Sequence, residues 1–170
     1  MIEEGKPAPD FELLTDSGET LRLSSLRGTP VVLYFYPKDA TPGCTAQACG
    51  IRDTWSAFAE AGAVVLGVSP DGVASHAKFK QSYDLPFTLL ADTEHSVAEA
   101  YGVWVEKSRY GRTYMGISRS TFVIDVDGNV AKVMANVQPA THAGEVLAAL
   151  APSPVCYSAS ATTLSSRASR

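Results

Sequence analysis

The sequence predicts an α/β fold in which a central mixed β-sheet is flanked by helices. Two observations lead to this prediction. Short apolar runs typical of buried strands alternate with helical apolar patterns from residue 31 to residue 101, and a strong hairpin pattern followed by one more helical pattern comes after them. A chain of 170 residues is long enough for one domain with a sizeable core.

Composition and charge exclude several classes of partner. Charged residues make up 19% of the chain and hydrophobic residues 45%, as in soluble globular proteins, and the net charge is -4. Lys and Arg form no cluster, so we expect no nucleic-acid or membrane partner. The polar N-terminus and the absence of a long apolar run predict a cytoplasmic protein.

The first half of the chain predicts an N-terminal hairpin, a buried strand and a long helix. Residues 11–14 and 20–23 flank a turn rich in Asp, Ser and Gly. The apolar run Val31–Tyr36 reads as a buried strand that Pro37 ends. A helix is expected from Pro42 to Ala61, with Gly62 as its stop. Its predicted buried face comprises Cys44, Ala48, Ile51, Trp55, Phe58 and Ala59.

The second half adds strands and helices in a recognisable order. Strands are expected at 64–68 and 87–90, helices after Ser69 and at 94–101, an exposed loop with strand fragments at 103–112, a hairpin of 120–124 with 130–134, and a helix through 143–150. This order of elements is that of a thioredoxin-like fold. Residues 1–150 form the predicted domain. Residues 151–170 are rich in Ser, Ala and Thr, and we interpret them as a disordered tail or an expression remnant.

Cys44 lies where a strand ends and a helix begins. Thr41 is the expected N-cap and Pro42 the first helical residue, which places Cys44 in the first turn. Unpaired N–H groups and the positive end of the helix dipole both stabilise a thiolate, the nucleophilic form of cysteine. The alternative is a buried structural cysteine, which is a common fate of a free thiol. We favour a reactive thiol, because a second cysteine follows closely.

That second cysteine, Cys49, is five residues further along the predicted helix. Helix geometry separates the two Cα atoms by about 8.6 Å. A disulfide needs Cα atoms within about 4.4–6.8 Å. Therefore either the two thiols never pair, or the start of the helix unwinds to let them pair.

A histidine or an arginine is the expected charged partner of the Cys44 thiol. None of the three histidines is adjacent to Cys44 in the sequence, and a lone histidine on a helical face is more often structural. Arg119 directly precedes a predicted strand that could run beside Val31–Tyr36, and an arginine stays charged. A solvated surface charge is the alternative for Arg119.

The motif Pro37-x-x-x-Thr41-x-x-Cys44 resembles the active-site pattern of the peroxiredoxins. The similarity to the bacterioferritin comigratory protein, or peroxiredoxin Q, branch covers about residues 5–150. It continues in the stretches Phe35–Lys38, Gln47–Cys49, Ile51–Asp53, His76–Phe79, Leu89–Asp92 and Gly116–Phe122.

This resemblance implies a thiol peroxidase that reduces hydrogen peroxide and organic hydroperoxides. Cys44 matches the peroxidatic cysteine and Cys49 the resolving cysteine, which would form an intramolecular disulfide. Thr41 and Arg119 match residues that bind the peroxide oxygens, and Pro37 matches one that shields the pocket. Gln47 matches a position that helps to orient the arginine.

The resemblance also implies partners and assembly. It predicts a monomer, with a weak dimer as the alternative, reduced by thioredoxin or a glutaredoxin-like dithiol protein. No metal and no bound cofactor are expected.

Three other functions remain as alternatives. A general disulfide oxidoreductase would have two cysteines separated by two residues, and it would reduce insulin rather than peroxide. A metal-binding module would need a ligand-pair spacing that Cys44, Cys49 and Cys156 lack. An interaction domain on the same fold would make the set of Thr41, Cys44, Cys49 and Arg119 a coincidence.

Overall fold

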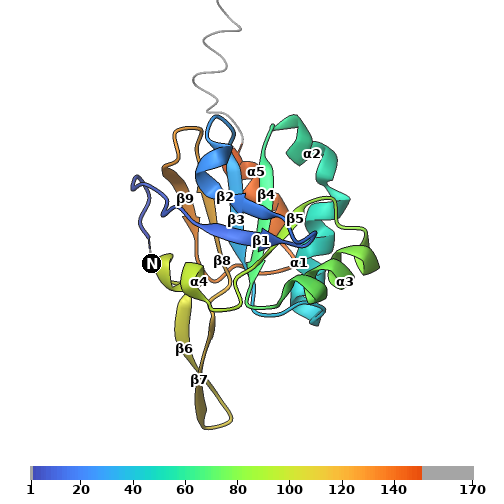
Figure 1. Ribbon diagram of the computed structural model, residues 1–170, viewed down its shortest axis with the longest axis vertical. Helices are drawn as coiled ribbons and strands as arrows, with labels where there is room; N and C mark the ends of the chain where they lie inside the picture. The colour runs from blue at the N-terminus through green and yellow to red at the C-terminus, as the bar shows by residue number, and fades with distance from the viewer. Residues whose placement is uncertain (1, 151–170) are drawn as a thin grey trace, which may run out of the picture.

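The computed structural model describes residues 2–150, which form a seven-stranded mixed sheet, a separate two-stranded hairpin and the helices that surround the sheet (Figure 1). The first elements are β1 (Glu12–Thr15), β2 (Thr20–Arg22), η1 (Leu23–Leu26), β3 (Val31–Phe35), α1 (Pro42–Asp53), α2 (Trp55–Glu60), β4 (Val64–Ser69) and α3 (Val73–Tyr83). Then come β5 (Thr88–Ala91), α4 (Ser96–Ala100), β6 (Trp104–Arg109), β7 (Arg112–Ile117), β8 (Ser120–Ile124), β9 (Val130–Met134) and α5 (His142–Leu150). The predicted tail, 151–170, lies outside the described residues.

The strand order of the main sheet is β2-β1-β5-β4-β3-β8-β9. Strand β3 is parallel to β4, and β4 is parallel to β5, whereas the other neighbours are antiparallel. The predicted α/β, thioredoxin-like fold is confirmed. The predicted N-terminal hairpin is also present, and it extends the main sheet because β1 pairs with β5.

Strand β3 lies in the middle of the sheet and is buried on both faces. Val31, Leu33 and Phe35 pack into the cluster that contains residues of α4. Val32 and Tyr34, which point to the opposite face, join the cluster that contains residues of α1, α2, α3 and α5. This period-two alternation explains the unbroken apolar run, because each face of the strand meets its own core.

The helix expected from Pro42 to Ala61 is two helices, with a break at Thr54. Thr54 has φ −113° and ψ 21°, and its hydroxyl donates to the carbonyl of Gly50 at 2.9 Å. Such a side-chain bond competes with the helical ladder, and threonine is a mediocre helix former. The predicted buried face of the helix is correct at Phe58, which is buried, but wrong at Ala59, which is exposed. Gly62 follows α2 with φ +68°, a conformation that suits a helix stop.

The expected loop at 103–112 is instead part of a regular hairpin, β6–β7, which projects from the body of the molecule (Figure 1). Tyr110 and Gly111 form its two-residue turn, both with positive φ. Asn-Gly or Asp-Gly would have signalled such a turn, and Tyr-Gly does not. Exposed charged and polar residues on both strands hide the alternation that usually marks a strand, because so little of the hairpin is buried.

Candidate active site

Cys44 is buried in the first turn of α1, with 1% of its surface exposed. The helix begins at Pro42 with Thr41 as its N-cap, and the N–H of Thr45 donates to the carbonyl of Thr41 at 2.8 Å. A helix that begins there leaves the N–H groups of Gly43 and Cys44 without partners inside the helix. The thiol therefore lies at the positive end of the helix dipole, as the sequence predicts.

Arg119 reaches this thiol from the neighbouring strand. The pair Phe35 and Ser120 places the start of β8 beside the end of β3, so the predicted adjacency of these strands is confirmed. Nη1 of Arg119 lies 3.4 Å from Sγ of Cys44 and donates to Oε1 of Gln47 at 2.7 Å. The guanidinium also lies close to Gly43, where an added Cβ would be 3.2 Å from Nη2. The structure thus brings Cys44 and Arg119 together although 75 residues separate them.

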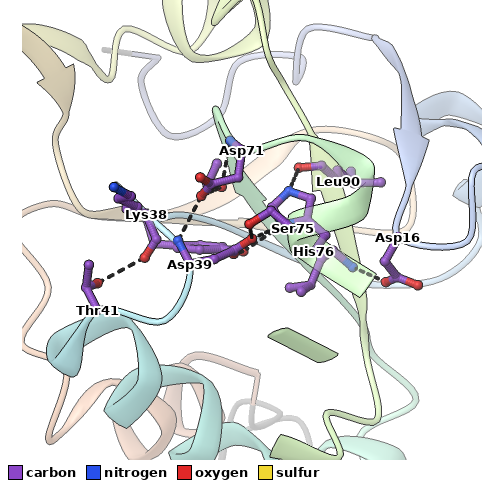
Figure 2. A network of polar contacts seen from close by, with 11 residues as sticks. Asp16, Lys38, Asp39, Thr41, Asp71, Ser75, His76 and Leu90 are labelled. Atoms are coloured by element: carbon purple, nitrogen blue, oxygen red, sulfur yellow. Dashed lines mark hydrogen bonds and ion pairs between the residues drawn. The ribbon is translucent and has the colours of Figure 1, made fainter. Parts of the chain in front are cut away.

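Thr41 is half-buried at the edge of this site. Its hydroxyl donates to the backbone carbonyl of Lys38 at 2.9 Å and makes no side-chain capping bond with α1 (Figure 2). Thr41 is thus the N-cap residue by its backbone position, while its hydroxyl proton is donated to the loop. The lone pairs of the Thr41 oxygen remain available to accept a hydrogen bond.

Cys49 lies in the same unbroken helix, α1, and is half-buried. Both Cys44 and Cys49 are free thiols here. The structure therefore presents the reduced arrangement in which helix geometry keeps the two thiols too far apart to bond. Pro37, the remaining predicted site residue, is half-buried just after β3.

A buried polar network holds the loop between β3 and α1 (Figure 2). Asp39 accepts hydrogen bonds from the Tyr36 hydroxyl at 2.6 Å and the Ser75 hydroxyl at 2.8 Å, and it pairs with Nδ1 of His76 at 2.8 Å. The backbone N–H of Asp39 donates to Asp71 at 2.8 Å. The loop that carries Pro37 and Thr41 is thereby fixed to the N-terminal part of α3.

The ionisation states of this network follow from its contacts. Burial would raise the pKa of Asp39, but hydrogen bonds from His76 and Tyr36 outweigh it and hold that pKa below its ordinary value. Burial raises the pKa of Tyr36 well above its ordinary value, so its hydroxyl keeps its proton and donates. Nε2 of His76 lies 2.9 Å from the carbonyl of Leu90, and because a carbonyl only accepts, this nitrogen is the donor of that bond.

Sequence reasoning missed two histidines that take part in these contacts. His76 supports the loop through Asp39, and His142 at the start of α5 bonds Gln47 at 3.2 Å. They lie 32 and 98 positions after Cys44 in the sequence. Their tertiary contacts had no local signal, because a buried histidine on a helical face looks the same whether or not a polar partner faces it.

The projecting hairpin contributes a second positive charge near the site. Partial burial lowers the pKa of Lys107, and the positive charge of Arg119 lowers it further. The side chain of Lys107 crosses Gly116, where an added Cβ would lie 3.3 Å from it. The charge of Lys107, on β6, is therefore coupled to that of Arg119, which contacts the thiol.

Residues 2–150 contain neither a cluster of metal ligands nor a helix that could span a membrane. No group of three or more His, Cys, Asp or Glu side chains within this range is placed to hold a metal ion. No helix in the same range is long and apolar enough to cross a membrane.

The chain is similar to known proteins over most of its length. The model of the AhpC/TSA family matches residues 5–133. Peroxiredoxin Bcp of Bacillus subtilis (strain 168) is 52% identical over 149 residues, which cover 88% of this chain and 95% of the relative. Peroxiredoxin Bcp of Escherichia coli (strain K12) is 44% identical over 146 residues, which cover 86% of this chain and 94% of the relative.

Solved structures agree with the sequence comparison. The bacterioferritin comigratory protein of Xanthomonas campestris, studied for alkyl peroxide reduction in trapped intermediate and ligand complexes, superposes with a TM-score of 0.82 at 37% identity, covering 87% of this chain and 97% of that one. BcpB of Mycobacterium tuberculosis gives a TM-score of 0.79 at 39% identity, covering 88% and 97%.

Proposed function

This chain belongs to the AhpC/TSA family, in the branch of peroxiredoxin Bcp and peroxiredoxin Q, and on that premise we propose a role for each residue of its site. The chain is a thiol peroxidase. We assign the peroxidatic thiol to Cys44 and the resolving thiol to Cys49. One observation carries the first assignment, namely the 3.4 Å contact between Arg119 Nη1 and the buried Sγ of Cys44 at a helix N-terminus.

In the first step the Cys44 thiolate attacks the terminal oxygen of a hydroperoxide. An S–O bond forms and the O–O bond breaks. Cys44 becomes a sulfenic acid, and the leaving oxygen takes a proton to become an alcohol, or water when the substrate is hydrogen peroxide. Negative charge moves from sulfur to the leaving oxygen, so donors that face both atoms stabilise the transition state.

Arg119 and the free N–H groups of the first turn of α1 are those donors. Arg119 has five N–H bonds in a rigid planar group, and one of them donates to Gln47. Thr41 offers the complementary group, an oxygen with free lone pairs that accepts the hydroperoxide O–H. Pro37 covers the loop side of the site and limits access of water.

In the second step Cys49 attacks the sulfur of the Cys44 sulfenic acid. An S–S bond forms, the S–O bond breaks, and water leaves after protonation. The intact α1 keeps the thiols too far apart, so the first turns of α1 must unwind for this step. A dithiol protein of the thioredoxin or glutaredoxin kind then reduces the disulfide by exchange, in a cytoplasmic setting where such donors are maintained. We propose that the enzyme works as a monomer, with a weak dimer as the alternative, on hydrogen peroxide and organic hydroperoxides.

Thiol titration with one equivalent of hydrogen peroxide per chain tests the proposal. The wild type should lose two of its three thiols and regain both with thioredoxin and its reductase. Cys44→Ser should lose none on the same timescale. Cys49→Ser should complete one turnover and accumulate a sulfenic acid that dimedone traps.

Two outcomes would contradict the assignment. Peroxide consumption by Cys44→Ser at the wild-type rate would remove Cys44 from its role. A Cys49→Ser variant that turns over with thioredoxin as the wild type does would remove Cys49 from the resolving step.

A further inference from the structure

A chain of hydrogen bonds continues from the thiol through Arg119 into the protein interior. Arg119 donates to Oε1 of Gln47 at 2.7 Å, and Nε2 of Gln47 lies 3.2 Å from Nδ1 of His142. Nε2 of His142 lies 2.7 Å from the hydroxyl of Thr121. The side chains of Gln47, His142 and Thr121 are completely buried, so water cannot substitute for any of these partners.

The chemistry of the donors fixes the direction of every bond. An arginine only donates, so the group of Gln47 that faces Arg119 is the amide oxygen. The amide nitrogen therefore faces His142, and because it carries only donors, Nδ1 of His142 must be an unprotonated acceptor. The ring proton is consequently on Nε2, which donates to Thr121.

The surroundings of His142 keep the ring neutral. Burial lowers the pKa of His142 to about 4; Glu145 on the same helix opposes this effect, and the charge of Arg119 adds to it. From the other elements His142 faces Gln47 of α1, Thr121 of β8 and the ring of Tyr34 of β3, whose centroid is 5.5 Å away. Burial also raises the pKa of Tyr34 well above its ordinary value, so its phenol is uncharged.

We propose that His142 is a positioning residue for peroxide reduction, which holds the Gln47 amide in the one orientation that presents its oxygen to Arg119. Without an acceptor at the position of Nδ1, the amide nitrogen has no partner and the amide can turn over. Its N–H groups would then face the N–H groups of Arg119, and the guanidinium would leave the place from which it contacts Cys44. The proposal rests on the assignment of Cys44 as the reacting thiol.

Substitutions at His142 test this role. His142→Phe keeps an aromatic ring and removes the acceptor, and we expect the second-order rate constant for peroxide to fall about 10- to 100-fold. His142→Asn places an oxygen where Nδ1 was, and we expect it to stay within about threefold of the wild type, because the amide keeps its acceptor. Stopped-flow fluorescence can follow the reaction, since the chain has two tryptophans. His95→Asn is the matched control, because His95 is the N-cap residue before α4 and has a left-handed conformation that asparagine adopts readily.

A double-mutant cycle distinguishes positioning from loosened packing. If His142 acts through Gln47, then His142→Phe should slow the enzyme little further in a Gln47→Ala background. The rate of Cys44 alkylation by iodoacetamide should change much less than the peroxide rate, because alkylation needs no peroxide-orienting group. A variant that is merely loosened would alkylate faster and show additive losses.

The wild-type protein supplies a test that no folding defect can obscure. Nitrogen-15 NMR should show His142 protonated on Nε2 and unprotonated on Nδ1 from pH 8 to pH 5. A proton on Nδ1 at neutral pH, or equal rates for His142→Phe and the wild type, would overturn the proposal. Cys44→Ser is measured in the same experiment. If Cys44→Ser is inactive and His142→Phe is fully active, only the proposed role of His142 is wrong. If Cys44→Ser is active, the assignment of Cys44 as the reacting thiol is wrong, and the role of His142 falls with it.

Discussion

The guanidinium of Arg52 donates a hydrogen bond to the backbone carbonyl of Tyr83 at 2.8 Å and so joins the last turn of α1 to the end of α3. Ile51, the residue before it, is completely buried. By contrast, the first turns of α1 contain Gly43 and Thr45, both poor helix formers. The helix is therefore anchored at its C-terminal end and weak at its N-terminal end.

Formation of the disulfide should unwind α1 only as far as this anchor. Hydrogen exchange measured by mass spectrometry should become faster between Cys44 and Arg52 on oxidation and should stay slow in β3. In Arg52→Gln, which keeps a polar side chain but removes the charge-assisted bond, the region of faster exchange should extend toward α2. Full protection of residues 44–49 in the oxidised protein would exclude a disulfide between Cys44 and Cys49.

Replacement of Arg119 by lysine should slow peroxide reduction about 100-fold, although the positive charge is retained. One Arg119 nitrogen bonds both Cys44 and Gln47, which leaves the rest of the fork for the peroxide oxygens. An ammonium group has no planar fork with which to hold several acceptors at once. The measurement is the second-order rate constant with hydrogen peroxide, and a wild-type value would remove Arg119 from the site.

Two glycines of α1 provide a matched pair of substitutions. Gly43→Ala puts a methyl group 3.2 Å from Nη2 of Arg119 and 3.6 Å from Pro139, so the guanidinium must shift and the peroxide rate should fall about tenfold. Gly50→Ala meets Cβ of Ala143 at 3.8 Å, an ordinary contact. It should keep the wild-type rate and raise the free energy of unfolding by up to about 1 kcal/mol, because alanine favours the helix. Equal rates in the two variants would contradict the close approach of Arg119.

His142 should make the folded state less stable in acid. Its pKa is lowered from 6.5 to about 4, so between these pH values the unfolded chain binds a proton that the folded chain does not. The free energy of unfolding therefore falls as the pH falls through this window, and at about 1.36 kcal/mol per pKa unit the loss approaches about 3 kcal/mol. Urea unfolding of the wild type and His142→Phe between pH 7 and pH 4 measures the difference. Parallel pH profiles would show that His142 does not titrate in this way.

The sequence by itself determined the elements whose signals are local. The apolar run 31–36 identified the central strand, and the Asp-Gly turn identified the β8–β9 hairpin. Proline after a threonine marked the start of α1 and so put Cys44 in a first helical turn. These signals succeed because strand burial, turn conformation and helix capping depend on residues a few positions apart.

Only the tertiary structure decided which side chains meet Cys44. Arg119 arrives because β8 pairs with β3, and His142 reaches Gln47 because α5 lies over the same face of the sheet. Such contacts join positions as many as 95 residues apart, and a sequence pattern carries no direct signal for them because they depend on how complete elements pack.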